Sequence, residues 1–244
     1  MSLVLAATTP GEPEIFASLQ GEGPSMGKPC AFIRLSRCNL ACVWCDTAYT
    51  WRFTGDDRPH RDGVAYYRQD NQVTLDEADA AARIAALGQP RLVVTGGEPL
   101  LQAPALARLL ALLPGIAVEI ETNGTVAPPA SLDAWVQQYT VSPKLAHSGN
   151  PGALALIPER LHQWAVDPRA VFKFVIAEPG DVTEVLALSE TYALQRDRIY
   201  LMAEGTDSAT LARRERWLAQ LCLSESLTLS KRLHIELYGD RRGT

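Results

Sequence analysis

The chain has 244 residues, of which 47% are hydrophobic and 21% charged, so it is long enough to bury a substantial core. Its formal net charge of −5 gives no general attraction to nucleic acid. No apolar run approaches the roughly 20 residues of a membrane span, and the first ten residues lack the basic region of a signal peptide. These features indicate a cytoplasmic protein without a nucleic-acid or membrane partner. Five clustered cysteines are too few for a disulfide framework and favour thiol chemistry or metal binding.

Short apolar strands alternate along the chain with segments of helical length. We predict strands at residues 30–36, 91–97, 117–124, 139–144, 170–180, 198–205 and 232–239. We predict helices within 74–88, 103–115 and 207–222, where acidic, Pro or Ser/Asp residues suit the start and where Gly or Pro-Gly ends the first two. The alternation predicts an α/β fold whose parallel sheet, with about seven strands, closes only into a partial, incomplete parallel β/α barrel.

The chain shows no repeat, low-complexity tract or linker, so residues 1–244 are expected to form a single domain. One stretch departs from the strand and helix pattern. Residues 48–72 are polar, rich in turn-forming residues and without clear periodicity, which suggests either an inserted flap over a site or a dimer contact.

Polar residues recur on one face of several predicted strands, where a buried parallel sheet is normally apolar on both faces. They are Arg34, Glu119, Glu121, Lys173 and His234. A barrel with a polar lumen accounts for all of them, although any one alone could lie on a half-exposed strand or in a core ion pair. Further polar residues follow the strand ends, where barrel enzymes place their active sites: Glu98, Glu121, Asn123, Lys144 and Glu204.

Cys38, Cys42 and Cys45 have the spacing C-x3-C-x2-C and no fourth cysteine follows. A structural zinc site needs four ligands, and the nearest candidates for the fourth, Cys30 and His60, have no familiar zinc spacing. A four-iron four-sulfur (4Fe–4S) cluster held by three thiolates leaves one iron open to a substrate or cofactor. The cluster is therefore the favoured interpretation. Cys30 and Cys222 lie in apolar segments and read as small core residues.

Several motifs together resemble the 7-carboxy-7-deazaguanine synthase family of radical S-adenosylmethionine (SAM) enzymes. The cysteine motif with Trp44 before its last cysteine resembles the superfamily as a whole. The stretch FASLQGEGPSMGKPCAFIRLSRCNLACVWCDT at 16–47 narrows the resemblance, and VTGGEPLLQ, EIETNGT and SPK follow in the family's order. The resemblance implies a radical SAM partial barrel that contracts the ring of 6-carboxy-5,6,7,8-tetrahydropterin to 7-carboxy-7-deazaguanine. This reaction releases ammonia and belongs to queuosine and 7-deazapurine biosynthesis.

The resemblance also implies cofactors and partners. The cofactors are a 4Fe–4S cluster, SAM and Mg²⁺, the partners are a pterin substrate and a flavodoxin or ferredoxin electron donor, and the expected assembly is a homodimer. No side chain is expected to act as a nucleophile or base, because the cluster and SAM carry the chemistry. The chain continues after His234 as IELYGDRRGT, whereas some family members end soon after the equivalent histidine and use their terminal carboxylate at the substrate.

Carried over residue by residue, the family pattern implies three groups of site residues. Cys38, Cys42 and Cys45 hold the cluster and Thr47 the Mg²⁺. The substrate contacts are Leu19, Gln20, Gly21, Glu22, Arg34, Thr95, Glu121 and His234. The SAM contacts are Trp44, Cys45, Asp46, Gly96, Gly97, Glu98, Asn123, Ser142, Pro143, Lys144, Leu201, Met202, Ala203 and Glu204.

A physical reason supports parts of this assignment. The Gly-Gly turn after a strand lets backbone groups approach a ligand closely, and the guanidinium of Arg34 can pair bidentately with a carboxylate. Two alternatives stay open from the sequence. A glycyl-radical-enzyme activase shares the cysteine spacing, and a non-enzymatic zinc-binding module would use the cysteines structurally.

Overall fold

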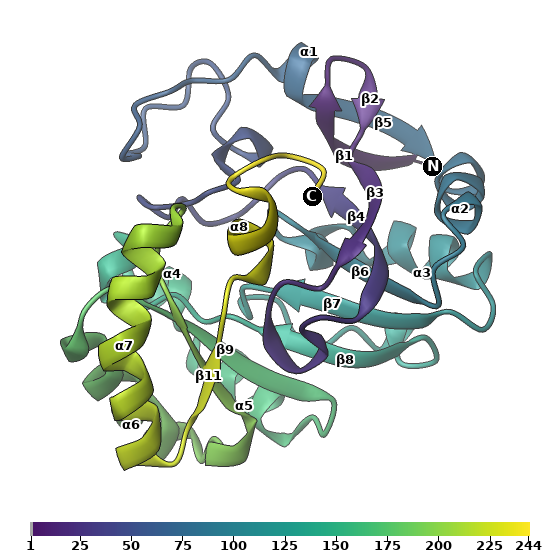
Figure 1. The fold of residues 1–244 in the computed structure, drawn as a ribbon. Helices are drawn as coiled ribbons and strands as arrows, with labels where there is room; N and C mark the ends of the chain where they lie inside the picture. Colours follow the sequence, from purple (N-terminus) through teal and green to yellow (C-terminus); the bar gives the residue numbers. More distant parts are fainter. Residues whose placement is uncertain (1) are drawn as a thin grey trace.

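The computed structural model describes residues 2–244, and Figure 1 shows their arrangement. The strands are β1 (Ser2–Thr9), β2 (Glu12–Pro13), β3 (Ile15–Leu19), β4 (Pro29–Leu35), β5 (Gln72–Asp76), β6 (Arg91–Gly96), β7 (Ala117–Thr122), β8 (Val136–Val141), β9 (Ala170–Ile176), β10 (Ile199–Ala203) and β11 (Thr228–Ser230). The α-helices are α1 (Arg68–Asn71), α2 (Glu77–Ala86), α3 (Ala103–Ala111), α4 (Gly152–Ala155), α5 (Pro158–Val166), α6 (Pro179–Tyr192), α7 (Ser208–Glu225) and α8 (Leu233–Tyr238).

The named strands of residues 2–244 form one sheet whose main path runs β11-β10-β9-β8-β7-β6-β4-β1-β2. From β4 to β11 every neighbouring pair on this path is parallel, as crossover connections require. The N-terminal strands differ, because β3 pairs antiparallel with β4 and β5 pairs antiparallel with β1. The sheet stays open, since β11 pairs with β10 and not with β4. The predicted α/β partial barrel is confirmed.

The two faces of the parallel sheet have different chemistry. Residues on one face are apolar and fully buried, such as Val94 in β6 and Phe172 and Phe174 in β9, and they share one core with Leu106 of α3 and Leu218 of α7. Because side chains alternate along a strand, the residues between them point to the other face. That face contains the polar side chains expected of a polar lumen, including Glu119 and Lys173.

The predicted elements agree with the structure over the middle of the chain. Six of the seven predicted strands correspond to β4 and β6–β10, and the predicted helices at 103–115 and 207–222 correspond to α3 and α7. Helix α2 begins later than predicted, because Gln72–Asp76 pair with β1 before Asp76 caps the helix by accepting from the amides of Ala78 and Asp79. The prediction missed β1, β2, β3, β5 and β11.

The predicted strand at 232–239 is wrong, because Leu233–Tyr238 form helix α8. The amide of Ile235 donates to the carbonyl of Arg232 at 3.0 Å, and that of Gly239 donates to Ile235 at 3.0 Å. In a segment this short, apolar spacing cannot separate a strand from a helix. The last parallel position of the sheet belongs instead to β11, and Figure 1 shows α8 lying between α7 and β4.

Residues 48–72, predicted to form an inserted flap or a dimer contact, fold onto the loop that contains the cysteines. His60 Nε2 lies 2.8 Å from the carbonyl oxygen of Cys45, and the amide of Arg61 donates to Val43 at 2.8 Å. Arg61 also forms an ion pair of 2.5 Å with Glu204 at the end of β10. The flap position therefore agrees with these contacts, while its role in a dimer and the single-domain organisation of 1–244 stay predictions. In residues 2–244 we find no helix long and apolar enough to cross a membrane.

Candidate active site

A cavity of about 340 Å³ opens at the carboxyl ends of the parallel strands. Its size suits a small-molecule site, and its position is where parallel β/α folds bind ligands. The lining comes from the three cysteines, the glycine turn after β6, the β3 end, the flap and α8. The elements that carry the sequence motifs therefore meet at one place.

Most of the predicted site residues line this cavity. The predicted substrate residues all do: Leu19, Gln20, Gly21, Glu22, Arg34, Thr95, Glu121 and His234. The predicted metal ligands also do: Cys38, Cys42, Cys45 and Thr47. Of the predicted SAM contacts, the following line it: Trp44, Cys45, Asp46, Gly96, Gly97, Asn123, Ser142, Lys144, Met202 and Glu204.

Four predicted SAM contacts do not line the cavity. Leu201 and Ala203 are 0% and 1% exposed and belong to the apolar core, because β10 turns alternate side chains away from the cavity. Pro143 lies between the two lining residues Ser142 and Lys144. Glu98 is 0% exposed, and its carboxylate accepts from the amides of Leu100 at 3.0 Å and Asn123 at 2.7 Å and from the hydroxyl of Thr122 at 2.9 Å. Its side chain therefore holds the turn, and burial raises its pKa.

The cysteine loop surrounds one side of the cavity with three free thiols. Burial raises the pKa of Cys38 to about 12 and that of Cys45 to about 11, so metal ligation must displace their protons. Within residues 2–244 no three His, Cys, Asp or Glu side chains converge tightly enough to hold one metal ion. The thiolates of a 4Fe–4S cluster bind different iron atoms, so they must surround a space rather than meet at a point. Three soft sulfur donors around one cavity fit that group.

The glycine turn after β6 packs directly on the cysteine loop. The amide of Gly97 donates to Leu35 at 3.0 Å, and that of Glu98 donates to Arg37 at 2.9 Å. A Cβ atom on Gly96 would lie 2.0 Å from the carbonyl oxygen of Leu35. Only glycine allows this approach, which brings backbone groups of the turn beside the cysteines.

Lys144 and Trp44 supply polar groups next to the cysteine loop. Lys144 Nζ lies 5.8 Å from the centroid of the Trp44 ring and 2.8 Å from Ser142 Oγ, and it makes no salt bridge among the ion pairs of residues 2–244. The buried indole Nε1 of Trp44 has no hydrogen-bond partner in the described chain. A cation and an unpaired donor at the same wall fit a bound ligand with carboxylate and other acceptor groups, as SAM has.

A second polar group of the lining centres on Glu121. Glu121 accepts from Thr95 Oγ1 at 2.7 Å and from Gln20 Nε2 at 3.2 Å. One carboxylate thus aligns side chains from β6, β7 and the end of β3. Its two oxygens and the amide of Gln20 can accept and donate to the edge of a heterocycle.

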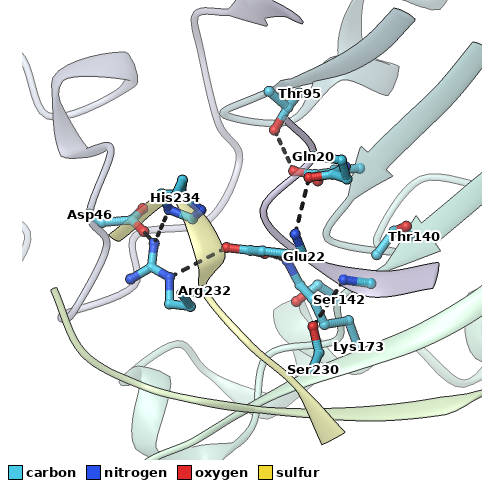
Figure 2. A network of polar contacts seen from close by, with 12 residues as sticks. Gln20, Glu22, Asp46, Thr95, Thr140, Ser142, Lys173, Ser230, Arg232 and His234 are labelled. Carbon is cyan, nitrogen blue, oxygen red and sulfur yellow. Dashed lines mark hydrogen bonds and ion pairs between the residues drawn. The ribbon is translucent and has the colours of Figure 1, made fainter. Parts of the chain in front are cut away.

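Glu22 lies at the centre of an ion-pair network that Figure 2 shows from close by. It pairs with Lys173 of β9 and, at 3.3 Å, with the guanidinium of Arg232, which also pairs with Asp46 beside the last cysteine. Burial would raise the pKa of Glu22, but the charges of Lys173 and Arg232 outweigh it and hold that pKa well below its usual range. Glu22 is therefore a carboxylate near neutral pH, and Arg232 connects it to the cysteine loop.

His234 enters the cavity from the first turn of α8. The amide of Leu233 donates to the carbonyl of Gly21 at 3.0 Å, and a Cβ atom on Gly21 would lie 2.1 Å from Nδ1 of His234. Glycine at 21 is therefore required for the histidine to pack here. Burial lowers the pKa of His234, which favours the neutral imidazole.

Arg34 is oriented by residues that the sequence prediction missed. Its Nε donates to Glu14 Oε1 at 2.9 Å, and Tyr49 Oη donates to the other oxygen of Glu14 at 2.9 Å. Glu14 is 0% exposed, and its carboxylate accepts from both Arg34 and Tyr49. A glutamate two residues before Phe16, directly before strand β3 that leads to the site, was the available signal. Arg232 had a weaker signal, its position two residues before His234.

Comparison with known proteins agrees with this geometry. The Radical SAM superfamily model matches residues 32–141. The chain is 37% identical to the 7-carboxy-7-deazaguanine synthase of Pyrobaculum aerophilum over 94% of this chain and 95% of that protein. It is 31% identical to the enzyme of the same name from Escherichia coli K12, over 91% and 95% of the two chains.

Solved structures show the same fold. The crystal structure of QueE from Escherichia coli superposes with a TM-score of 0.66 at 26% identity, over 95% of each chain. These relatives favour the synthase over the activase and the zinc-binding module. Radical SAM membership implies a 4Fe–4S cluster and SAM as cofactors. The predicted family is confirmed: the chain belongs to the 7-carboxy-7-deazaguanine synthases, lyases of the radical SAM superfamily that act in queuosine biosynthesis.

Proposed function

We propose that this chain contracts the ring of 6-carboxy-5,6,7,8-tetrahydropterin to 7-carboxy-7-deazaguanine with loss of ammonia. The observation that supports this most is that one cavity is lined by the three cysteines and by all eight residues expected at the substrate. Chemistry on the pterin and binding of the pterin would then occur in a single space.

The cysteine side of the cavity is the proposed place for the cofactors. Cys38, Cys42 and Cys45 would hold the cluster, and Lys144 with the backbone of Gly96 and Gly97 would receive the methionine part of SAM. When bound, the cluster and SAM supply the one-electron chemistry that makes a substrate radical. The protein positions the reactants and limits the space open to water.

The part of the lining around Glu121, Glu22 and Arg34 is the proposed pterin site. Glu121, Gln20 and Glu22 offer acceptors and an amide to the donor-rich edge of the heterocycle, while the terminal nitrogens of Arg34, which Glu14 does not use, would pair with the substrate carboxylate. Glu14 stabilises the positive charge of Arg34 and fixes the plane of its guanidinium. His234, kept neutral by burial, can accept or donate one hydrogen bond without adding charge.

Thr47 is the proposed Mg²⁺ ligand. Its Oγ1 lies 3.6 Å from Cys45 Sγ in the lining of the cavity. A hydroxyl near a substrate carboxylate suits a hard cation that keeps several waters. Turnover should therefore fall when chelator removes Mg²⁺ and recover when Mg²⁺ is restored.

The deciding experiment is an anaerobic turnover assay on protein reconstituted with iron and sulfide, with a chemical reductant, SAM and 6-carboxy-5,6,7,8-tetrahydropterin. The expected product is 7-carboxy-7-deazaguanine, identified by mass and ultraviolet absorption. Cys45→Ala should lose the cluster and the activity. Cys222→Ala should keep both, because Cys222 lies on α7 in the hydrophobic core and does not line the cavity. Full iron content and turnover in Cys45→Ala would refute the proposal.

Three further parts of the assignment stay predictions. Flavodoxin or ferredoxin is the expected electron donor, the protein is expected to be a homodimer, and its expected location is the cytoplasm. Reduction by purified flavodoxin and light scattering of the purified protein would test the first two.

A further inference from the structure

Residues 145–150, which follow β8, lie against the cysteine loop from outside the cysteine motif. The amide of Val43 donates to the carbonyl of Ser148 at 2.9 Å. Gly149 has a φ of 75°, and a Cβ atom there would lie 2.7 Å from Cγ1 of Val43. The ring of His147 stacks on that of Trp44 at 5.5 Å. Consecutive residues of the cysteine loop are thus packed against one segment about a hundred positions away.

Asn150 makes the most specific of these contacts. Its Oδ1 accepts from the amide of Ala41 at 2.8 Å, and its Nδ2 lies 3.3 Å from Sγ of Cys42 and 3.2 Å from Oγ of Ser148. Because the amide of Ala41 can only donate, it requires the side-chain oxygen of Asn150 on that side. The amino group of Asn150 must then face the sulfur of Cys42, so the orientation does not depend on an arbitrary choice between O and N.

The contact to Cys42 differs from the polar contacts of the other two cysteines. Nδ2 of Asn123 lies 3.8 Å from Cys38 Sγ, and Oγ1 of Thr47 lies 3.6 Å from Cys45 Sγ. The 3.3 Å contact of Asn150 is shorter than either. It also reaches a sulfur in a residue only 6% exposed, where little water competes with the hydrogen bond.

We propose that Asn150 is a positioning residue that fixes the Cys42 thiolate and raises the reduction potential of the cluster. The inference rests on the proposed function, because it assumes that Cys42 ligates the cluster. A donor N–H stabilises negative charge on the sulfur. The reduced cluster carries one more electron than the oxidised cluster, so the same donor stabilises it more, and hydrogen bonds to sulfur are a known determinant of cluster potential.

Two substitutions separate the positioning of the Cys42 thiolate from the effect on the reduction potential of the cluster. Asn150→Asp has the same shape and keeps an acceptor for the amide of Ala41, but replaces the donor with a negative charge. Asn150→Ala removes both contacts without adding charge. Asn71→Asp is the matched control, because the Asn71 side chain contacts Tyr67 and Arg242 and no cysteine.

The measurement is a reductive titration of the reconstituted cluster followed by electron paramagnetic resonance, without SAM or substrate. We expect the equilibrium constant for reduction to fall about tenfold in Asn150→Asp, which is about 59 mV for one electron. It should fall several-fold in Asn150→Ala and stay unchanged in Asn71→Asp. Cluster loss from both Asn150 variants with wild-type melting temperatures of the apo proteins would also support the positioning role.

Two results would overturn the inference. One is a full cluster with the wild-type potential in both Asn150 variants. The other is cluster loss together with a lowered apo melting temperature, which would make Asn150 a structural residue only. Failure of the wild-type protein to bind iron and sulfide would instead contradict the proposed function.

Discussion

Gly97→Ala should disturb the cysteine loop although Gly97 ligates nothing. A Cβ atom at Gly97 would lie 2.1 Å from the carbonyl oxygen of Arg37 and 3.0 Å from the amide nitrogen of Cys38, whereas real Cβ atoms essentially never come closer than 3.0 Å. The difference, 3.0 minus 2.1 Å, requires a shift of about 0.9 Å in one of two backbone segments. The shift would strain the hydrogen bonds that join the amides of Gly97 and Glu98 to Leu35 and Arg37.

The expected cost follows from these contacts. Overpacking of a tight site costs about 1–3 kcal/mol, and weakening two hydrogen bonds adds about 1 kcal/mol, so we expect a loss of roughly 2–4 kcal/mol. For a chain of this length that loss lowers the melting temperature by about 5–15 °C. The iron content after reconstitution should fall as well, because the clash reaches Cys38.

The assay is thermal unfolding of the apo protein together with iron analysis of the reconstituted protein. Gly180→Ala is the matched control, since the nearest atom to its Cβ would be Glu178 Oε1 at an ordinary 3.6 Å and position 180 lies in α6. Alanine there should be neutral or stabilise by up to about 1 kcal/mol. A wild-type melting temperature and iron content in Gly97→Ala would refute the argument that close packing couples the glycine turn to the cysteine loop.

Three further predictions concern the charged residues Glu22, Lys173 and Arg34 of the lining. Lys173→Met should lower the free energy of unfolding, measured in urea, by up to about 3 kcal/mol, because Glu22 keeps only Arg232 as an ion-pair partner. The double variant that combines Lys173→Met with Glu22→Gln should recover this stability but not the affinity for the pterin. The folded-state pKa of Glu22 is lowered, so Glu22 stabilises the apo protein above its unfolded pKa near 4.5, and this stabilisation is lost as the pH falls below that value. The free energy of unfolding should therefore decrease less steeply with falling pH in Glu22→Gln. Arg34→Lys loses the Nε contact to Glu14 and the planar fork, so calorimetry should show at least about tenfold weaker pterin binding with unchanged iron content; unchanged affinity would make Arg34 structural.

Local signals predicted the central part of the fold. The parallel strands β4 and β6–β10 are short segments rich in apolar residues and followed by turns, α3 has Pro104 in its first turn, and α7 is capped by Asp207. Strands β1, β3 and β5 carry weaker signals, since their pairing is antiparallel and β3 is only half buried. Such strands are specified by their partners more than by their own residues.

The site shows the same division between short motifs and distant partners. Cysteine spacing and the Gly-Gly turn are local, and both were found in the sequence. Glu14, Arg232 and Asn150 act through contacts with residues 20 to 210 positions away, and the sequence around them does not identify those partners. Alternation along β10 could have separated Met202 and Glu204 from Leu201 and Ala203, because side chains of a strand alternate between its faces.

Charge pairing explains how a cavity with balanced charge can still bind anions. Six acidic and six basic side chains line it, so composition predicts no preference for either sign. The pairing is uneven, however. Lys173 and Arg232 pair with Glu22 and Asp46, and Arg34 pairs through its Nε with Glu14. The lining cations Lys144, Arg241 and Arg242 make no ion pair within residues 2–244, and neither do the lining carboxylates Glu121 and Asp240. Cationic donors therefore stay available beside Trp44 of the cysteine loop, at Lys144, and beside Tyr49 of the flap, at the terminal nitrogens of Arg34, as two bound carboxylates on two different ligands would require.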